Sequence, residues 1–231
     1  MGFHCHVGSQ VFTEDVFERS AVIMLEFIAK MQKETGFRTG MLDLGGGYGV
    51  RYVESDPYVD IPAKIQSVGI TVRETCARLS IEEPEILMEP GRSIVADAGM
   101  TLYTVGAVKQ IPGYKNYVSI DGGMADNPRN ALYGSVYTCL AAGKMRENSS
   151  MRCDLVGRCC ESGDIITPGI FMPGTIARGD LVAVCTTGAY NYSMASNYNR
   201  IPRPPVVMLR EGTSRLAVRR ESPENLISLD I

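Results

Sequence analysis

Strand and helix patterns alternate over residues 1–97 of this 231-residue chain, and that order limits the folds open to it. Three short apolar runs end in glycine or proline: "GFHCHVG", "MLDLGGGYG" and "EILMEPGR". Between them, apolar residues recur at intervals of three and four, which is typical of amphipathic helices. The order strand–helix–strand–helix–strand predicts parallel strands joined by right-handed crossovers. A closed barrel or an open doubly wound sheet usually needs more strands than these.

The two expected helices have recognisable ends. Thr13 can cap the first, with Glu14 and Asp15 in its first turn, and Gly36 is expected to stop it. The second is expected to begin near Pro62. The apolar stripe of the first consists of Phe17, Ala21, Met24, Ile28 and Met31, and that of the second of Ile65, Val68, Val72, Cys76 and Leu79.

Residues 98–231 have a different texture, with β-rich runs separated by Gly and Pro turns. The runs are "MTLYTVGAVKQI", "NYVSID", "MRCDLVG", "DLVAVCTTG" and "VVMLREGTSRLAVRR". This half is expected to form an antiparallel barrel or sandwich. Glu211 to Ser214 predicts a hairpin turn in which Gly212 takes a positive φ. Ser222 and Pro223 predict the start of a short helix.

Composition excludes several classes of function. Lys and Arg number 23 against 26 Asp and Glu, and this net charge of −3 disfavours nucleic-acid binding, which needs a basic surface. No apolar run reaches the length of a membrane span, and the first residues lack the pattern of a signal peptide. The seven cysteines are odd in number and form no C-x-x-C pair. We therefore expect reduced thiols in a cytoplasmic protein, with no disulfide framework and no metal site.

The motifs "HVGS", "GGGYG" and "EPGR" each follow one of the three expected strands. Ligands of parallel α/β folds bind at the carboxyl ends of strands. Gly45, Gly46, Gly47 and Gly49 leave backbone N–H groups free to approach a phosphate, or they form only a tight turn. Their spacing is not G-x-G-x-x-G, so a dinucleotide fingerprint is not supported.

Glu89 and Arg92 are charged residues around a fixed turn. Arginine offers a planar fork to phosphate or carboxylate, and Pro90 and Gly91 can direct both side chains into one pocket. Capping or an ion pair is the structural alternative for Glu89.

His4 and His6 lie on the same side of one expected strand, and they are the only histidines. A metal pair, a satisfied core histidine and a ring stacked on a cofactor all remain open.

The second half has its own candidates. Cys160 beside Glu161 in "RCCESGD" is either a thiol acid/base or a small hydrophobe next to a surface acid. Arg129 and Tyr133 are four residues apart, so they can share one face of a helical turn. The stretch "TTGAYNYSMASNYN" is a polar, aromatic loop rather than core.

Seven motifs in this order resemble the fold-type III pyridoxal-phosphate-dependent decarboxylases over essentially the whole chain. They are "HCHVGSQ", "LDLGGGYG", "MEPGRS", "DGGMADNPRNALYG", "CCESGD", "TTGAYNYSMASNYN" and "RPPVVML". The likeness is closest to the members that act on diaminopimelate, because the ornithine enzymes typically read C-D-G-x-D at "CESGD". The implied fold is an alanine racemase-like (β/α)8 TIM barrel followed by an antiparallel β-domain. Residues 1–97 would be its last three βα units and residues 98–231 its C-terminal β-domain.

The resemblance implies pyridoxal 5'-phosphate as cofactor and assigns roles to residues. His6 would stack on the pyridine ring, Glu89 would face its nitrogen, and Cys160 would be the catalytic proton donor. Glu161 would recognise the distal ammonium of a diamino acid. The cofactor-binding residues would be His6, Ser9, Gly45, Gly46, Gly47, Glu89, Pro90, Gly91, Arg92 and Tyr190. The substrate-binding residues would be Arg92, Arg129, Tyr133, Glu161 and Tyr190.

The implied activity is decarboxylation of meso-2,6-diaminopimelate to L-lysine, the last step of lysine biosynthesis, by a homodimer with shared sites. One departure from the family is decisive. The lysine that attaches the cofactor as an aldimine matches none of the six lysines here, so we expect an N-terminally truncated chain that is inactive alone. An inactive fragment or partner subunit, and a related ornithine, arginine or carboxynorspermidine decarboxylase, are the alternatives.

Overall fold

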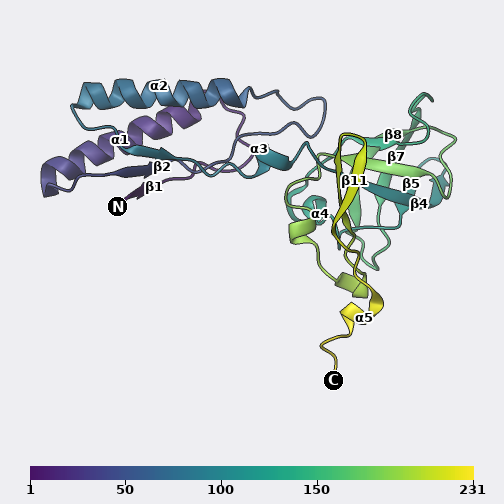
Figure 1. Ribbon diagram of the computed structural model, residues 1–231. Helices are drawn as coiled ribbons and strands as arrows, with labels where there is room; N and C mark the ends of the chain where they lie inside the picture. The colour runs from purple at the N-terminus through teal and green to yellow at the C-terminus, as the bar shows by residue number, and fades with distance from the viewer. The chain divides into compact units, whose positions relative to one another are not determined.

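The computed structural model describes residues 1–231, which form two compact units, Met1–Ala96 and Asp97–Ile231. The first unit is α/β and the second is almost entirely β (Figure 1).

The first unit contains a parallel sheet of three short strands in the order β1-β2-β3. The strands are β1 (Gly2–His4), β2 (Met41–Asp43) and β3 (Glu85–Leu87). Helix α1 (Val16–Thr35) connects the first two, and α2 (Ile61–Leu79) connects the second and third. Because the two helices pack against one another and against one face of the sheet, the other face has no helical cover within this unit (Figure 1).

The helix ends follow local chemistry, with one correction. Helix α1 begins at Val16 rather than after a Thr13 cap, because Asp15 occupies the N-cap position in a left-handed conformation. Gly36 ends the helix with φ 73°, as predicted. Helix α2 begins beside Pro62, and the Asp60 side chain accepts a hydrogen bond from the Ala63 N–H at 3.0 Å.

The core lies between the helices and the sheet. From α1 it takes Phe17, Ala21, Leu25 and Ile28, and the predicted Met24 packs against this core while half-buried. Met31 is also half-buried. From α2 it takes Val68, Val72 and Cys76, whereas Ile65 is exposed. Ile65 lies outside the core because only one arc of each helix contacts the sheet and the neighbouring helix.

Alternate residues of the first strand and its extension face opposite ways. Phe3, Cys5 and Val7 pack against the core, as predicted. His4 is on the other face and is aligned with Asp43 of β2, which is in turn aligned with Leu87 of β3. The period-two alternation of a strand therefore places the polar side chains on the sheet face without helices.

The second unit contains a six-stranded sheet in the order β6-β9-β4-β5-β7-β8. Its edge strands, β6 and β8, contact each other, so the sheet nearly closes on itself. All pairs are antiparallel except β5 with β7, which corrects the fully antiparallel expectation. A parallel pair needs a long connection, and the segment between β5 and β7 supplies it. The strands are β4 (Met100–Ile111), β5 (Lys115–Ile120), β6 (Cys139–Ala141), β7 (Met151–Val156), β8 (Ile165–Met172) and β9 (Leu181–Cys185).

Short elements complete the second unit. Helix α4 (Arg129–Tyr133) lies between β5 and β6, and the 3-10 turns η1 (Tyr192–Met194) and η2 (Tyr198–Arg200) follow β9. Strands β10 (Val206–Arg210) and β11 (Thr213–Val218) form a hairpin, and α5 (Pro223–Leu226) ends the chain.

Two local predictions in this part of the chain are confirmed. Gly212 has φ 74° in the hairpin turn, and Ser222 caps α5 with Pro223 in its first turn. The seven cysteines are all free thiols. None of the helices combines the length and the hydropathy that a bilayer span requires.

Candidate active site

Polar side chains from the three strands of the first unit meet at the carboxyl end of the sheet. The Nε2 atom of His4 lies 3.2 Å from Oε2 of Glu89, just beyond β3. The Asp43 Oδ1 atom accepts a hydrogen bond from the Gly45 N–H at 2.9 Å. Ligand atoms of His4, Asp43 and Glu89 lie within 4.8 Å of one another, a set that could ligate a metal ion. The two hydrogen bonds already account for their arrangement, so we assign no metal.

The glycine loop after β2 ties the three strand ends together. Gly46 donates its N–H to Nδ1 of His6 at 3.3 Å, which sets the orientation of that ring. The Glu89 N–H donates to the Gly45 carbonyl at 2.8 Å. A side chain at Gly46 would collide with the Glu89 carbonyl, and one at Gly47 with the Gly8 carbonyl. The glycines are therefore required for the close approach of three backbones.

A buried guanidinium lies at the start of helix α3 (Arg92–Val95). Arg92 is 8% exposed, and it donates to the Ser9 hydroxyl at 3.1 Å and to the Tyr52 hydroxyl at 2.7 Å. The structure therefore brings together Ser9 and Arg92, to which the family resemblance gives one phosphate site. Tyr52 was missed, and no local pattern links it to an arginine 40 residues further on.

Three of the predicted substrate residues gather in the second unit. Arg129 is 7% exposed, at the start of α4. Its Cζ atom lies 5.1 Å from the ring centroid of Tyr133 and 5.8 Å from that of Tyr190. Both rings remain substantially exposed, and Tyr190 has φ 61°. A guanidinium between two aromatic faces is suited to an anionic group approaching from solvent.

Cys160 and Glu161 form a second group, on the loop between β7 and β8, and both are exposed. The loop is anchored by Asp164, which is 4% exposed. Its carboxylate accepts hydrogen bonds from the N–H groups of Met124 and Cys159, each at 2.6 Å. Burial, with the charge of Asp164, raises the pKa of the Cys159 thiol to about 11. Cys159 is therefore a protonated thiol at neutral pH, and Cys160 is the accessible one.

Comparisons with known proteins show what this chain is similar to. Residues 1–96 match the family model "pyridoxal-dependent decarboxylase, pyridoxal binding domain". The whole chain is 44% identical to diaminopimelate decarboxylase of Bacillus subtilis over 231 residues, covering 52% of that protein. The chain is therefore similar to the pyridoxal-dependent decarboxylases over its whole length. It spans about half the length of the curated relatives it matches.

Solved structures of decarboxylases have the same fold. Diaminopimelate decarboxylase from M. jannaschii matches 99% of this chain and 51% of its own, with a TM-score of 0.91 and 30% identity. The Helicobacter pylori enzyme complexed with L-lysine matches 98% of this chain and 53% of its own, with a TM-score of 0.83 and 30% identity. The predicted fold class, part of a (β/α)8 barrel followed by a β-domain, is confirmed.

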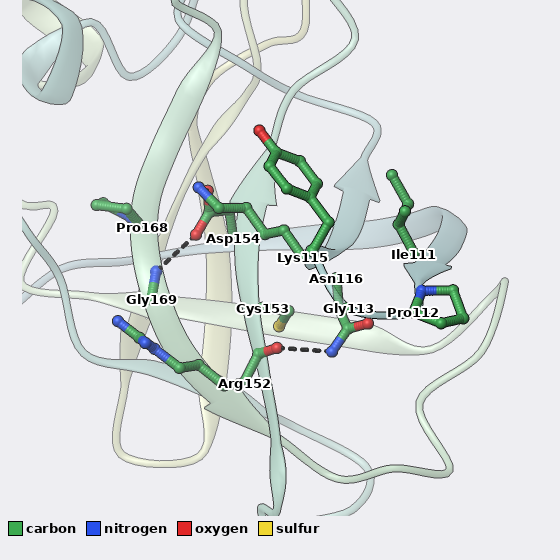
Figure 2. Close-up of a pocket in the computed structure, with 11 residues that line it drawn as sticks. Ile111, Pro112, Gly113, Lys115, Asn116, Arg152, Cys153, Asp154, Pro168 and Gly169 are labelled. Carbon is green, nitrogen blue, oxygen red and sulfur yellow. Dashed lines mark hydrogen bonds and ion pairs between the residues drawn. The ribbon is translucent and has the colours of Figure 1, made fainter.

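A hollow of about 640 Å³ lies beside the β4–β5 turn (Figure 2). None of the candidate site residues lines it. There Lys115 pairs with Asp154 at 2.8 Å, and the other carboxylate oxygen of Asp154 accepts from the Gly169 N–H. The Asp154 carboxylate in this hollow is therefore already paired.

Residues near the chain end also support the Cys160 loop, and sequence analysis missed them. The Asn199 Oδ1 atom accepts a hydrogen bond from the Cys160 N–H at 2.9 Å. Asn197, two residues earlier, donates to the Glu221 carboxylate at 2.7 Å. The Glu221 carboxylate also accepts hydrogen bonds from Nε of Arg203 at 2.7 Å and from the backbone N–H of Arg203 at 2.9 Å. The only signal for this part of the site was the polar character of the loop.

These bonds predict a pH dependence of stability. The Arg203 side chain, followed by its N–H, lowers the pKa of Glu221 from the usual 4.5 to about 2. Since the folded-state pKa is the lower one, the stabilisation is complete above the usual pKa and is lost as the pH falls from about 4.5 to about 2. Urea unfolding of the wild type and of Glu221→Gln measures this effect between the two pH values. The difference between their free energies of unfolding should shrink as the pH falls. A constant difference would contradict the assignment.

Proposed function

We propose that this chain serves in the pyridoxal-phosphate-dependent decarboxylation of meso-2,6-diaminopimelate to L-lysine. The observation that carries the proposal is the convergence of an imidazole, a carboxylate and a glycine loop at three parallel strand ends, within the segment that matches a pyridoxal-binding family. The 44% identity to a diaminopimelate decarboxylase over the whole chain supports the substrate.

The residues of the first unit fit the cofactor by their chemistry. The Ser9 hydroxyl, the Arg92 guanidinium and the glycine backbone are suited to its phosphate. His6, whose orientation the Gly46 N–H sets, would lie against the ring. Glu89 would hold a proton on the ring nitrogen, as a carboxylate favours the charged form of a nearby base. When bound, the cofactor takes up the electron pair left as carbon dioxide departs.

The residues of the second unit would bind the substrate and move one proton. Arg129, with Tyr133 and Tyr190, would bind a substrate carboxylate. Glu161 would bind the distal ammonium, and the Cys160 thiol would donate a proton to the carbon that has lost its carboxylate. In the active form, this loop would enter the site of a second copy, which makes the protein a homodimer. Seven free thiols support a cytoplasmic location.

A non-catalytic fragment or partner subunit is the second candidate, and one observation favours it. The first unit has three lysines, Lys30, Lys33 and Lys64, and all three lie on α1 or α2 rather than at a strand end. None is placed beside Glu89 to attach the cofactor.

Turnover separates these candidates. Carbon dioxide release from meso-diaminopimelate and from ornithine is measured for the chain alone and for a chimaera that places the N-terminal half of the Bacillus subtilis enzyme before it. We expect an inactive chain and a chimaera that acts on diaminopimelate but not on ornithine. A chimaera without activity on diaminopimelate would overturn the proposal, and an active chain would overturn the non-catalytic candidate.

In the chimaera, Glu89→Gln should lower the decarboxylation rate roughly 100-fold, because a neutral amide no longer favours a protonated ring nitrogen. Cofactor affinity, followed by fluorescence, should change much less. Glu85→Gln is the matched control, since Glu85 is an exposed carboxylate at the opposite end of the same strand. A rate for Glu89→Gln equal to that of the control would show the role to be wrong.

A further inference from the structure

The loop that carries Cys160 is held by side chains at two successive backbone N–H groups. The Cys159 N–H donates to the carboxylate of Asp164, which belongs to the same loop. The Cys160 N–H donates to Oδ1 of Asn199, which lies 39 residues further along the chain. The second contact therefore couples the reactive cysteine to a distant turn.

The turn that contains Asn199 is fixed by contacts other than the one with the Cys160 loop. It lies inside η2 with φ 54° and ψ 24°, a left-handed conformation that asparagine adopts more readily than most residues. The turn is fixed on one side by Asn197 and Glu221 and on the other by Arg200, which pairs with Asp230 at 2.7 Å. The amide oxygen is thus presented to Cys160 by anchored backbone rather than by a mobile chain end.

The other functional residue of the loop, Glu161, is held by its neighbours along the chain. Its Oε1 atom accepts hydrogen bonds from the Ser162 hydroxyl at 3.3 Å and from the Gly163 N–H at 3.4 Å. Asn199 therefore acts on the Cys160 end of the loop, and local contacts hold Glu161.

We propose that Asn199 is a positioning residue for the backbone that carries the Cys160 thiol. The role of Cys160 that this inference uses rests on the proposed function. The contact acts on the group that transfers a proton, while Glu161, the group that selects the substrate, is held by other residues. Loss of Asn199 should therefore affect the chemical step and leave substrate binding nearly unchanged.

The contact with Asn199 is tested in the 231-residue chain by amide hydrogen exchange. Asn199→Ala should speed exchange of the Cys160 N–H by about tenfold or more, because this N–H loses its acceptor. Exchange of the Cys159 N–H should be unchanged, because its acceptor is Asp164. Asn199→Asp keeps an acceptor oxygen and should restore protection. Asn148→Ala, at an exposed asparagine in the loop before β7, is the control. Unchanged exchange at Cys160, or equal acceleration at Cys159, would overturn the inference.

The consequence is tested by kinetics in the chimaera. Asn199→Ala should lower kcat about tenfold with little change in the KM for diaminopimelate, and Asn199→Asp should recover most of it. The inference fails if Asn199→Ala lowers the melting temperature and kcat together, or if it raises KM with kcat retained. An inactive parent chimaera counts against the proposed function, and the exchange result then decides the contact by itself.

Discussion

Replacing Cys160 with alanine is expected to lower the turnover of diaminopimelate by a factor of roughly 100 to 10,000, the usual range for a general acid. The thiol is exposed on a loop whose two adjacent N–H groups are hydrogen-bonded, so it is available to a substrate and held in place. Because other residues, such as His6 and Glu89, are the predicted contacts of the cofactor ring, cofactor affinity should hardly change. Chimaera kinetics and a fluorescence titration of pyridoxal phosphate measure the two effects.

Cys159→Ala is the matched control for this prediction. The two cysteines are adjacent, but Cys159 is half-buried and burial raises its pKa to about 11. Its removal should change turnover by a small factor. Equal losses in the two variants, or a parallel loss of cofactor affinity in Cys160→Ala, would show that Cys160 supports structure rather than proton transfer.

Asp164→Asn is expected to lower the free energy of unfolding by roughly 2–4 kcal/mol, which is large for one atom changed. Both carboxylate oxygens accept backbone N–H groups, from Met124 and Cys159. An amide offers only one acceptor oxygen, and its NH2 group would face the other N–H donor. Side chains at Gly123 or Gly157 would collide with this carboxylate, so the surrounding backbone leaves no room to relax.

Chemical denaturation of the 231-residue chain measures this loss. Asp121→Asn is the control, because Asp121 is an exposed carboxylate that accepts a single backbone N–H, from Thr104 at 2.8 Å. It should cost less than about 1 kcal/mol. Equal losses at the two positions would mean that burial and the second hydrogen bond at Asp164 contribute nothing.

Contacts between near neighbours in the chain could be predicted from the sequence. Arg129 and Tyr133 are four residues apart, and one helical turn brings them within 5.1 Å. Gly36 ends α1 and Ser222 caps α5 for equally local reasons. The alternation of Phe3, His4 and Cys5 correctly separated a core face from a polar face. The family resemblance added the remaining candidates, but it did not say what holds them in place.

The sequence by itself determined the order of strands and helices, the faces of those elements and the motifs at the strand ends, because these depend on periodicity and on neighbours along the chain. The tertiary structure decided which distant groups meet: Tyr52 with Arg92, Asp164 with Met124, and Asn199 with Cys160. It also decided that β5 and β7 are parallel and that Leu25 rather than Met24 is buried. Packing, and not local pattern, selects among the long-range contacts that a chain of this length could make. Polar groups that this packing buries need hydrogen-bond partners, and the fold determines which groups are near enough to serve.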